Sequence, residues 1–217
     1  MPFANTLSAA AQTGTGTLVT DLREARDGGD VADSPRSDAL DHRGAALLPP
    51  VTSSAMTQVL DICLAKGAGI VFLSGARHGA DLQHLDVLLQ VAEARAGMTA
   101  GATRIVAMAG DNPHGLLAAA SFADKSARLI GLGWDSAALA VAMGAKAELG
   151  ADVASNARAT LLLAAAATNV VAIDTAEVEP DTDTFRTNCL HARAQGFSGK
   201  MTGTPWQVPV IQSVFAD

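Results

Sequence analysis

The sequence predicts an α/β fold built on a parallel sheet covered by helices. Short apolar runs alternate along the chain with longer stretches of helical periodicity. The short runs are apolar on both faces, as in strands that helices cover on both sides. Glycines follow several helical stretches at positions typical of C-terminal caps. Roughly six or seven β/α units fit either a TIM-type barrel or a doubly wound sheet.

The strands are predicted from the short apolar runs, and the helices from apolar residues spaced by threes and fours. The expected strands are 16–21, 45–48, 69–73, 104–108, 127–132, 170–174 and a short one at 200–202. The expected helices are 54–66, 81–96, 116–123, 137–147, 156–167 and 182–195. Gly67, Gly97 and Gly196 stand where three of these helices would end.

The chain is expected to form a single domain over residues 1–217, because no shift in composition marks a boundary. Residues 23–43 break the alternation with clustered Asp, Gly, Ser and Pro, and are expected to form an exposed loop.

Composition limits the classes of function. The 22 acidic and 15 basic residues give a formal net charge of −7, and no basic cluster is present, so nucleic acid is not an expected partner. The longest apolar run, 161–167, is far shorter than the roughly 20 residues that span a bilayer, and the N-terminus has no signal-peptide pattern. We therefore expect a soluble cytoplasmic protein. Cys63 and Cys189 have no metal-ligand or disulfide spacing and are expected to be buried.

Motifs for other chemistries are absent or incomplete. The segment GFSGKM at 196–201 lacks the first glycine and the Ser/Thr of a phosphate loop. His78 and His84 are six residues apart and would not share a helix face, so they do not suggest a zinc pair.

Acidic residues recur after the predicted strands, at the ends where barrel enzymes place their chemistry. Asp21 and Glu24 follow the first strand, Asp111 the fourth, Asp135 the fifth and Asp174 ends the sixth. Carboxylates of this kind suit Mg²⁺, which takes one or two of them and completes its shell with water and substrate. The alternative is that each Asp caps a helix or forms a turn.

Several ordered segments resemble the HpcH/HpaI aldolase and citrate lyase β-subunit (CitE-like) superfamily. They are AKGAGIV at 65–71, ADL at 80–82, Arg158, AID at 172–174, ARAQGFSGK at 192–200 and PWQVPVI at 205–211. The resemblance covers the second two-thirds of the chain, and the C-terminal segments match best.

The resemblance implies a TIM-type (β/α) barrel, here shortened at the N-terminus because the family's first strand is not found. It also implies a carbon–carbon lyase dependent on Mg²⁺, or Mn²⁺ in its place. The substrates would be citryl-, malyl- or citramalyl-CoA, or a related keto-acid aldol. Members often form homo-oligomers, so a trimer or hexamer is expected.

Site residues follow from the family motifs position by position. Asp111 aligns with a metal-binding Glu of the family. A gapless alignment puts Ser136 at the family's second metal ligand, an Asp. Asp135 takes that position if the alignment is shifted by one residue. Glu24 matches the second acidic position of a "DLEDAV" motif and would support the site. Gly133 and Trp134 would line the substrate pocket, with packing as an equal alternative for Trp134.

Other positions depart from the family pattern. The strand at 45–48 lacks the family's substrate-binding Arg, so Arg77 is a candidate replacement, with a solvated surface role as the alternative. Three hypotheses remain open: a short CitE-like lyase, a catalytically impaired homologue acting as a binding or regulatory subunit, and an aldolase or hydrolase acting on an unrelated small molecule. Asp111 and Asp135 facing one cavity would favour the first or third.

Overall fold

The computed structural model describes residues 5–7, 17–21, 44–145, 148–175, 181–202 and 204–216. Glu24 and the predicted loop at 23–43 lie outside the described residues. No helix in the described part of the chain is both long and apolar enough to cross a bilayer.

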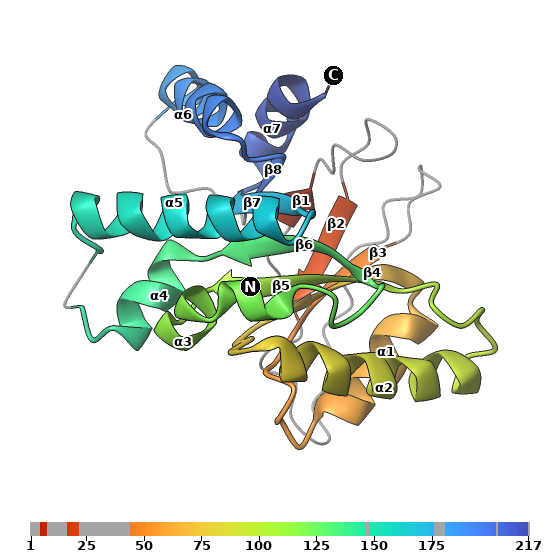
Figure 1. Cartoon of the computed structure of the whole chain (residues 1–217). Helices are drawn as coiled ribbons and strands as arrows, with labels where there is room; N and C mark the ends of the chain where they lie inside the picture. The colour runs from red at the N-terminus through yellow and green to blue at the C-terminus, as the bar shows by residue number, and fades with distance from the viewer. Residues whose placement is uncertain are drawn as a thin grey trace.

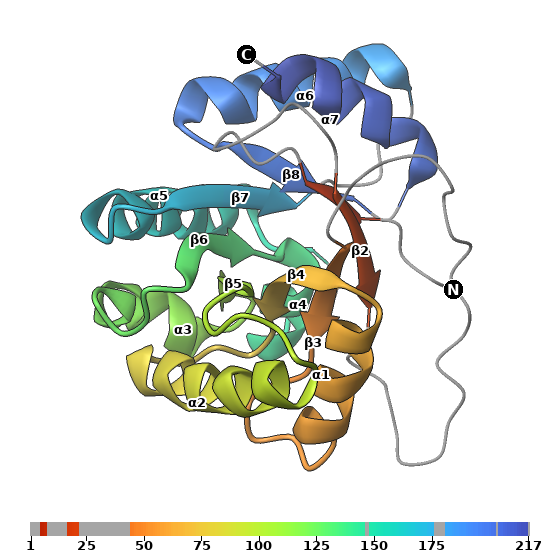
Figure 2. The same cartoon turned by 90° about the vertical axis from the view of Figure 1, so that its right-hand side faces the viewer.

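The described strands form one curled sheet in which chain order and spatial order coincide (Figures 1 and 2). Its strands are β1 (Asn5–Leu7), β2 (Thr17–Asp21), β3 (Gly44–Leu48), β4 (Ala68–Leu73), β5 (Arg104–Gly110), β6 (Leu129–Trp134), β7 (Val171–Thr175) and β8 (Gly199–Met201). All neighbours pair in parallel except β1, which is antiparallel to β2. Strand β1 also contacts β8, which brings the two ends of the sheet together. The absence of any reversal in strand order rules out a doubly wound sheet and confirms the shortened barrel.

Helices cover the outside of this sheet. They are α1 (Met56–Ala65), α2 (Gly79–Arg95), α3 (Pro113–Leu117), α4 (Ser136–Ala142), α5 (Ala151–Ala167), α6 (Thr182–Gln195) and α7 (Val208–Phe215), with 3₁₀ turns η1 (Ala119–Phe122) and η2 (Pro205–Gln207). The glycine caps are confirmed, since Gly67, Gly97 and Gly196 have φ values of +82°, +67° and +109°.

The predicted helix at 116–123 is wrong in its bounds. Asn112 caps the backbone N–H of Gly115 and Pro113 occupies the first turn, so α3 begins earlier and a 3₁₀ turn follows it. Strand β6 begins at Leu129, two residues later than expected. The two preceding residues form a turn that directs the Arg128 side chain into a buried ion-pair network.

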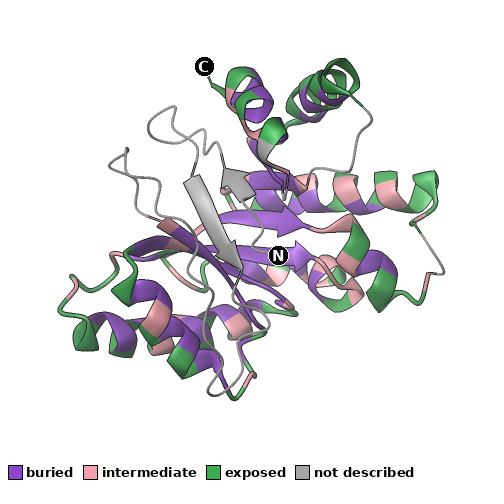
Figure 3. Cartoon of the chain, turned by 180° about the vertical axis from the view of Figure 1, so that it is seen from behind, coloured by how far each residue is buried: buried purple, intermediate pink, exposed green. Residues whose placement is uncertain are grey.

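Two apolar clusters lie on opposite faces of the sheet, because successive strand residues face opposite sides. The inner cluster fills the barrel and consists of Ala45, Leu47, Phe72, Val106, Met108, Ile173 and Met201. The larger outer cluster lies between the strands and the helices. Figure 3 shows the burial concentrated in the strands and on the helix faces against them. Cys63 and Cys189 are both buried, as expected, and burial raises the pKa of the Cys63 thiol to about 12.

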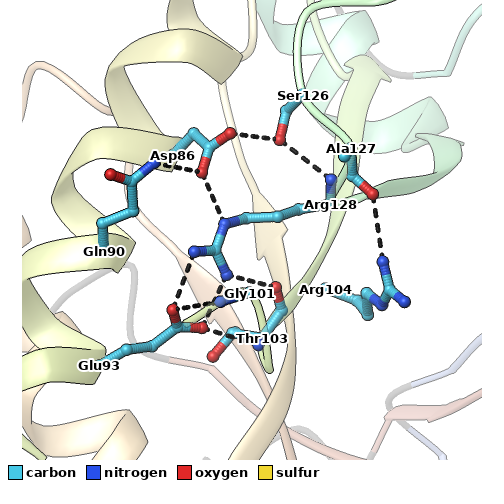
Figure 4. Close-up of polar contacts among 9 residues, drawn as sticks. All are labelled: Asp86, Gln90, Glu93, Gly101, Thr103, Arg104, Ser126, Ala127 and Arg128. Carbon is cyan, nitrogen blue, oxygen red and sulfur yellow. Dashed lines mark hydrogen bonds and ion pairs between the residues drawn. The ribbon is translucent and has the colours of Figure 1, made fainter. Parts of the chain in front are cut away.

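A buried ion-pair network connects a helix to two strands at the amino-terminal end of the barrel (Figure 4). Arg128, directly before β6, donates from both terminal nitrogens to Glu93 of α2 at 2.7 and 2.8 Å, and from Nε to Asp86 at 2.6 Å. The backbone N–H groups of Gly101 and Thr103 also donate to Glu93, each at 2.8 Å. This network ties α2 to the segments that lead into β5 and β6.

Candidate functional site

Two predicted metal ligands, Asp111 and Asp135, leave neighbouring strands at the carboxyl end of the barrel. Gly110 of β5 is in register with Trp134 of β6, so the next residue on each strand lies at the same edge of the sheet. The backbone N–H of Asp135 donates to the carbonyl of Gly110 at 3.3 Å. The structure therefore brings these two acidic positions together, as the β/α pattern predicted.

The half-buried Asp111 carboxylate is held by the loops around it. The backbone N–H of Gly75, after β4, donates to Oδ2 at 2.7 Å, and the Asn112 side chain donates to Oδ1 at 2.8 Å. Asn112 is fixed in turn, since its amide also donates to the carbonyl of Ala76 at 3.2 Å. These contacts set the orientation of a carboxylate that the sequence identified only by its place after a strand.

Asp135 caps a helix, which was the alternative interpretation of its position. Its Oδ1 accepts a hydrogen bond from the backbone N–H of Ala138 at 3.0 Å and so begins α4. Among the described contacts this cap engages Oδ1 alone. Capping and metal binding are compatible, since a carboxylate has two oxygens and about four lone-pair sites.

A cavity of about 500 Å³ opens among the loops that follow β3, β4 and β5. Asp111 and Asp135 are not among its lining residues, but Gly75, whose backbone N–H donates to Asp111, lines it. The side chain of Arg77 lines it, together with Asn112 and His114. Asp81 also lines the cavity, but it accepts hydrogen bonds from the backbone N–H groups of Arg77 and His78 at 2.7 and 3.2 Å. The structure thus places the exposed Arg77 beside Asn112, the neighbour of Asp111. Sequence reasoning missed Asn112 and His114, whose only signal was their place after a strand.

The structure places Gly133 and Trp134 among packed groups. A Cβ added to Gly133 would lie 2.5 Å from the sulfur of Met108, inside the barrel. Trp134 is buried in the outer cluster, and its indole N–H donates to Asp174 at 2.7 Å. These contacts are those of core residues, and a role of either residue in substrate binding stays a prediction.

The acidic residues at the strand ends divide into two groups. Asp174 follows Ile173 of the inner cluster, so it faces outward, away from Asp111 and Asp135. Within the described residues no group of three or more His, Cys, Asp or Glu side chains could hold a metal. Asp111 and Asp135 nevertheless fit Mg²⁺ as a donor set, because this ion needs only one or two carboxylates beside water and substrate oxygens.

Comparison with known proteins agrees with this architecture. The family model for HpcH/HpaI aldolase/citrate lyase matches residues 30–205. The curated proteins give no significant match. The chain is similar in structure to RipC from Yersinia pestis, with a TM-score of 0.71 and 24% identity over 96% of this chain and 92% of that one.

Two structures from Mycobacterium tuberculosis are also similar. The citrate lyase β subunit complexed with oxaloacetate and magnesium gives a TM-score of 0.72 and 21% identity over 94% of this chain and 88% of that one. CitE in complex with magnesium, acetoacetate and coenzyme A gives a TM-score of 0.70 and 21% identity over 94% and 74% of the two chains.

Proposed function

The chain belongs to the HpcH/HpaI aldolase/citrate lyase family, and from that premise we propose that it is a Mg²⁺-dependent carbon–carbon lyase. Its substrate is a 3-hydroxyacyl-CoA such as citryl-, malyl- or citramalyl-CoA, or a related keto-acid aldol. The observation that carries the proposal is the pair of carboxylates, Asp111 and Asp135, on adjacent strand ends. The cavity that Arg77 lines lies next to Asp111, since Gly75, which donates to Asp111, also lines it.

Asp111 and Asp135 are the residues that would hold Mg²⁺, which when bound stabilises negative charge developing on a carbonyl oxygen during carbon–carbon cleavage. The Gly75 N–H and the Asn112 amide keep the Asp111 carboxylate in one orientation. Glu24 stays a proposed supporting acid from the sequence motif.

Arg77 is proposed to bind a carboxylate of the substrate. A guanidinium presents paired N–H donors that match a carboxylate. Arg77 lines the cavity, and the nearby Asp81 carboxylate is engaged by backbone N–H groups. The relatives support this substrate class, because oxaloacetate and acetoacetate, bound to the two M. tuberculosis proteins, are both keto acids with a carboxylate. We further propose a cytoplasmic homo-oligomer, a trimer or hexamer, as in the family.

The decisive experiment measures Mg²⁺-dependent release of keto acid or glyoxylate from citryl-, malyl- and citramalyl-CoA. We expect D111N to lower kcat/KM by about 100-fold or more, since the metal contributes several kcal/mol to transition-state stabilisation. EDTA should abolish turnover, whereas D152N, at an exposed Asp on α5, should match the wild type. Lack of turnover by folded wild type across the panel would overturn the lyase proposal and favour the binding or regulatory homologue.

A further inference from the structure

A second cavity, of about 230 Å³, lies on the outside of the barrel between α5 and α6. Helix α6 packs against α7 and stands away from α5, as Figures 1 and 2 show. We call this cavity the lateral cleft. Its lining includes Ser155, Arg158, Thr175, Asn188, His191 and Lys200.

The lateral cleft is lined by two cations that share one buried carboxylate. Arg158 lies 2.5 Å from Oδ1 of Asp174, and the ammonium of Lys200 lies 2.7 Å from Oδ2. Asp174 is 0% exposed, and the side chains of Arg158 and Lys200 are 20% and 7% exposed. No second carboxylate pairs with either cation within the described residues, so this cluster carries one excess positive charge.

Water screens that excess charge poorly, because the side chains of both cations are largely buried. A buried cation is costly unless anions and hydrogen-bond acceptors surround it. Arg158 has a second acceptor, the side-chain oxygen of Gln195 at 2.8 Å, and its guanidinium stacks on Phe197 at 4.5 Å from the ring centroid. An ammonium has three N–H donors, and Lys200 directs its charge toward Asp174 alone among the described residues.

We propose that the lateral cleft binds a small oxyanion, a phosphate or carboxylate group, against Lys200 and Arg158. The excess positive charge supplies the attraction, and the polar side chains of Ser155 and His191 supply hydrogen-bonding groups around it. The pattern is opposite to that around Arg128, where two carboxylates surround one cation.

The lateral cleft is distinct from the proposed lyase site. Ile173 and Met201 belong to the inner cluster, so the residues next to them, Asp174 and Lys200, face the helices on the other side of the sheet. The anion proposal and the lyase proposal can therefore fail independently.

The test is calorimetric titration of the full chain with inorganic phosphate and, separately, with acetate. We expect saturable binding of at least one anion. The variant H191E, at an exposed position on the cleft, should weaken that binding by about tenfold, as expected for one added negative charge near the anion. H84E, which places the same change on an exposed position of α2, should bind as the wild type does.

The relative affinities identify the group: tighter phosphate binding indicates a phosphate ligand, and tighter acetate binding a carboxylate. Absence of saturable binding of both anions, or equal weakening by H191E and H84E, would overturn the proposal. S155E repeats the test from α5, so the result does not depend on one helix.

A final variant tests whether carboxylates of the chain itself pair with the cations of the lateral cleft. Glu177 and Glu179 lie in the sequence between β7 and α6, outside the described residues. We expect the double variant E177Q/E179Q to bind the anion with unchanged affinity. If only this variant binds phosphate or acetate, the cleft serves an internal ion pair and the proposal is wrong.

Discussion

The two ends of the barrel use charged residues in different ways. At the amino-terminal end, Arg128 and Glu93 are 5% and 1% exposed, and they satisfy one another through two hydrogen bonds. At the carboxyl-terminal end, Asp111 and Asp135 are only half-buried, and Arg77 is exposed beside a cavity. A saturated, buried network contributes to stability, whereas partly exposed groups beside a cavity can bind a ligand.

The buried contacts at the amino-terminal end also shift the pKa values of the residues that make them. Burial alone would raise the pKa of Glu93, but hydrogen bonds from Arg128, Thr103 and Gly101 outweigh it and lower the pKa to about 2. Hydrogen bonds to Glu93 and Asp86 hold the pKa of Arg128 above its usual value. The amino-terminal pair is therefore charged throughout the physiological pH range and is unsuited to proton transfer near neutral pH.

The largest effect is expected from breaking the amino-terminal network with R128M. This change leaves Glu93 and Asp86 without their cation, and we expect the free energy of unfolding to fall by about 3–5 kcal/mol in urea denaturation. The matched control is R104M, because Arg104 is exposed and donates a single hydrogen bond to the carbonyl of Ala127. The control should change stability by less than about 0.5 kcal/mol. Equal losses in the two variants would refute the stabilising role of the Arg128 network.

Acid should weaken the same network. Because the folded-state pKa of Glu93 is about 2 against an ordinary 4.5, its contribution is complete above about pH 4.5 and is lost as the pH falls toward 2. The shift corresponds to about 3 kcal/mol. Stability measured between pH 7 and pH 2 should fall less steeply in E93Q than in the wild type. D61N, at an exposed ion pair with Arg95, should follow the wild-type curve, and an unchanged slope in E93Q would contradict the assignment.

The smallest effect on free energy is expected at the carboxyl-terminal end. A hydrogen bond to a charged group contributes about 1.5–3 kcal/mol, so R77M should raise KM for the cleaved substrate by about 10- to 100-fold, with little change in stability or kcat. R95M, at an exposed Arg at the end of α2, the helix that follows Arg77 in the chain, should leave KM unchanged. An unaltered KM in R77M would mean that Arg77 does not bind substrate and is a solvated surface residue.

Much of the fold could be predicted from periodicity. The helix at 182–195 was predicted with its observed bounds, and the strand starts at 104 and 45 fell within one residue. The prediction was poorest where polar groups set the boundaries. Because of Asn112 and Pro113, α3 begins earlier than predicted. Strand β6 begins later than predicted, after the residue Arg128, whose side chain is held in the ion-pair network. The eight-residue helix α7, Val208–Phe215, was not predicted as a helix at all.

The candidate site was only partly predictable. Carboxylates at the ends of four predicted strands could be found by inspection, but the pairing register of β5 with β6 selects Asp111 and Asp135 as neighbours. Asp174 met the same sequence criterion, yet its place in the pleat turns it toward the helices. The partners of Arg128 at Glu93 and Asp86 are 35 and 42 residues away, and nothing in the local sequence identifies them.

The sequence by itself determined the alternation of strand and helix, the parallel sheet and the family, because these depend on local periodicity and on short ordered motifs. The tertiary structure alone decided which charged groups meet and which face a cavity. Those outcomes depend on strand register, on pleat and on helix packing, which bring distant side chains within a few ångströms of one another. The balanced network at Arg128 and the excess cation at Lys200 therefore became visible only in the folded chain.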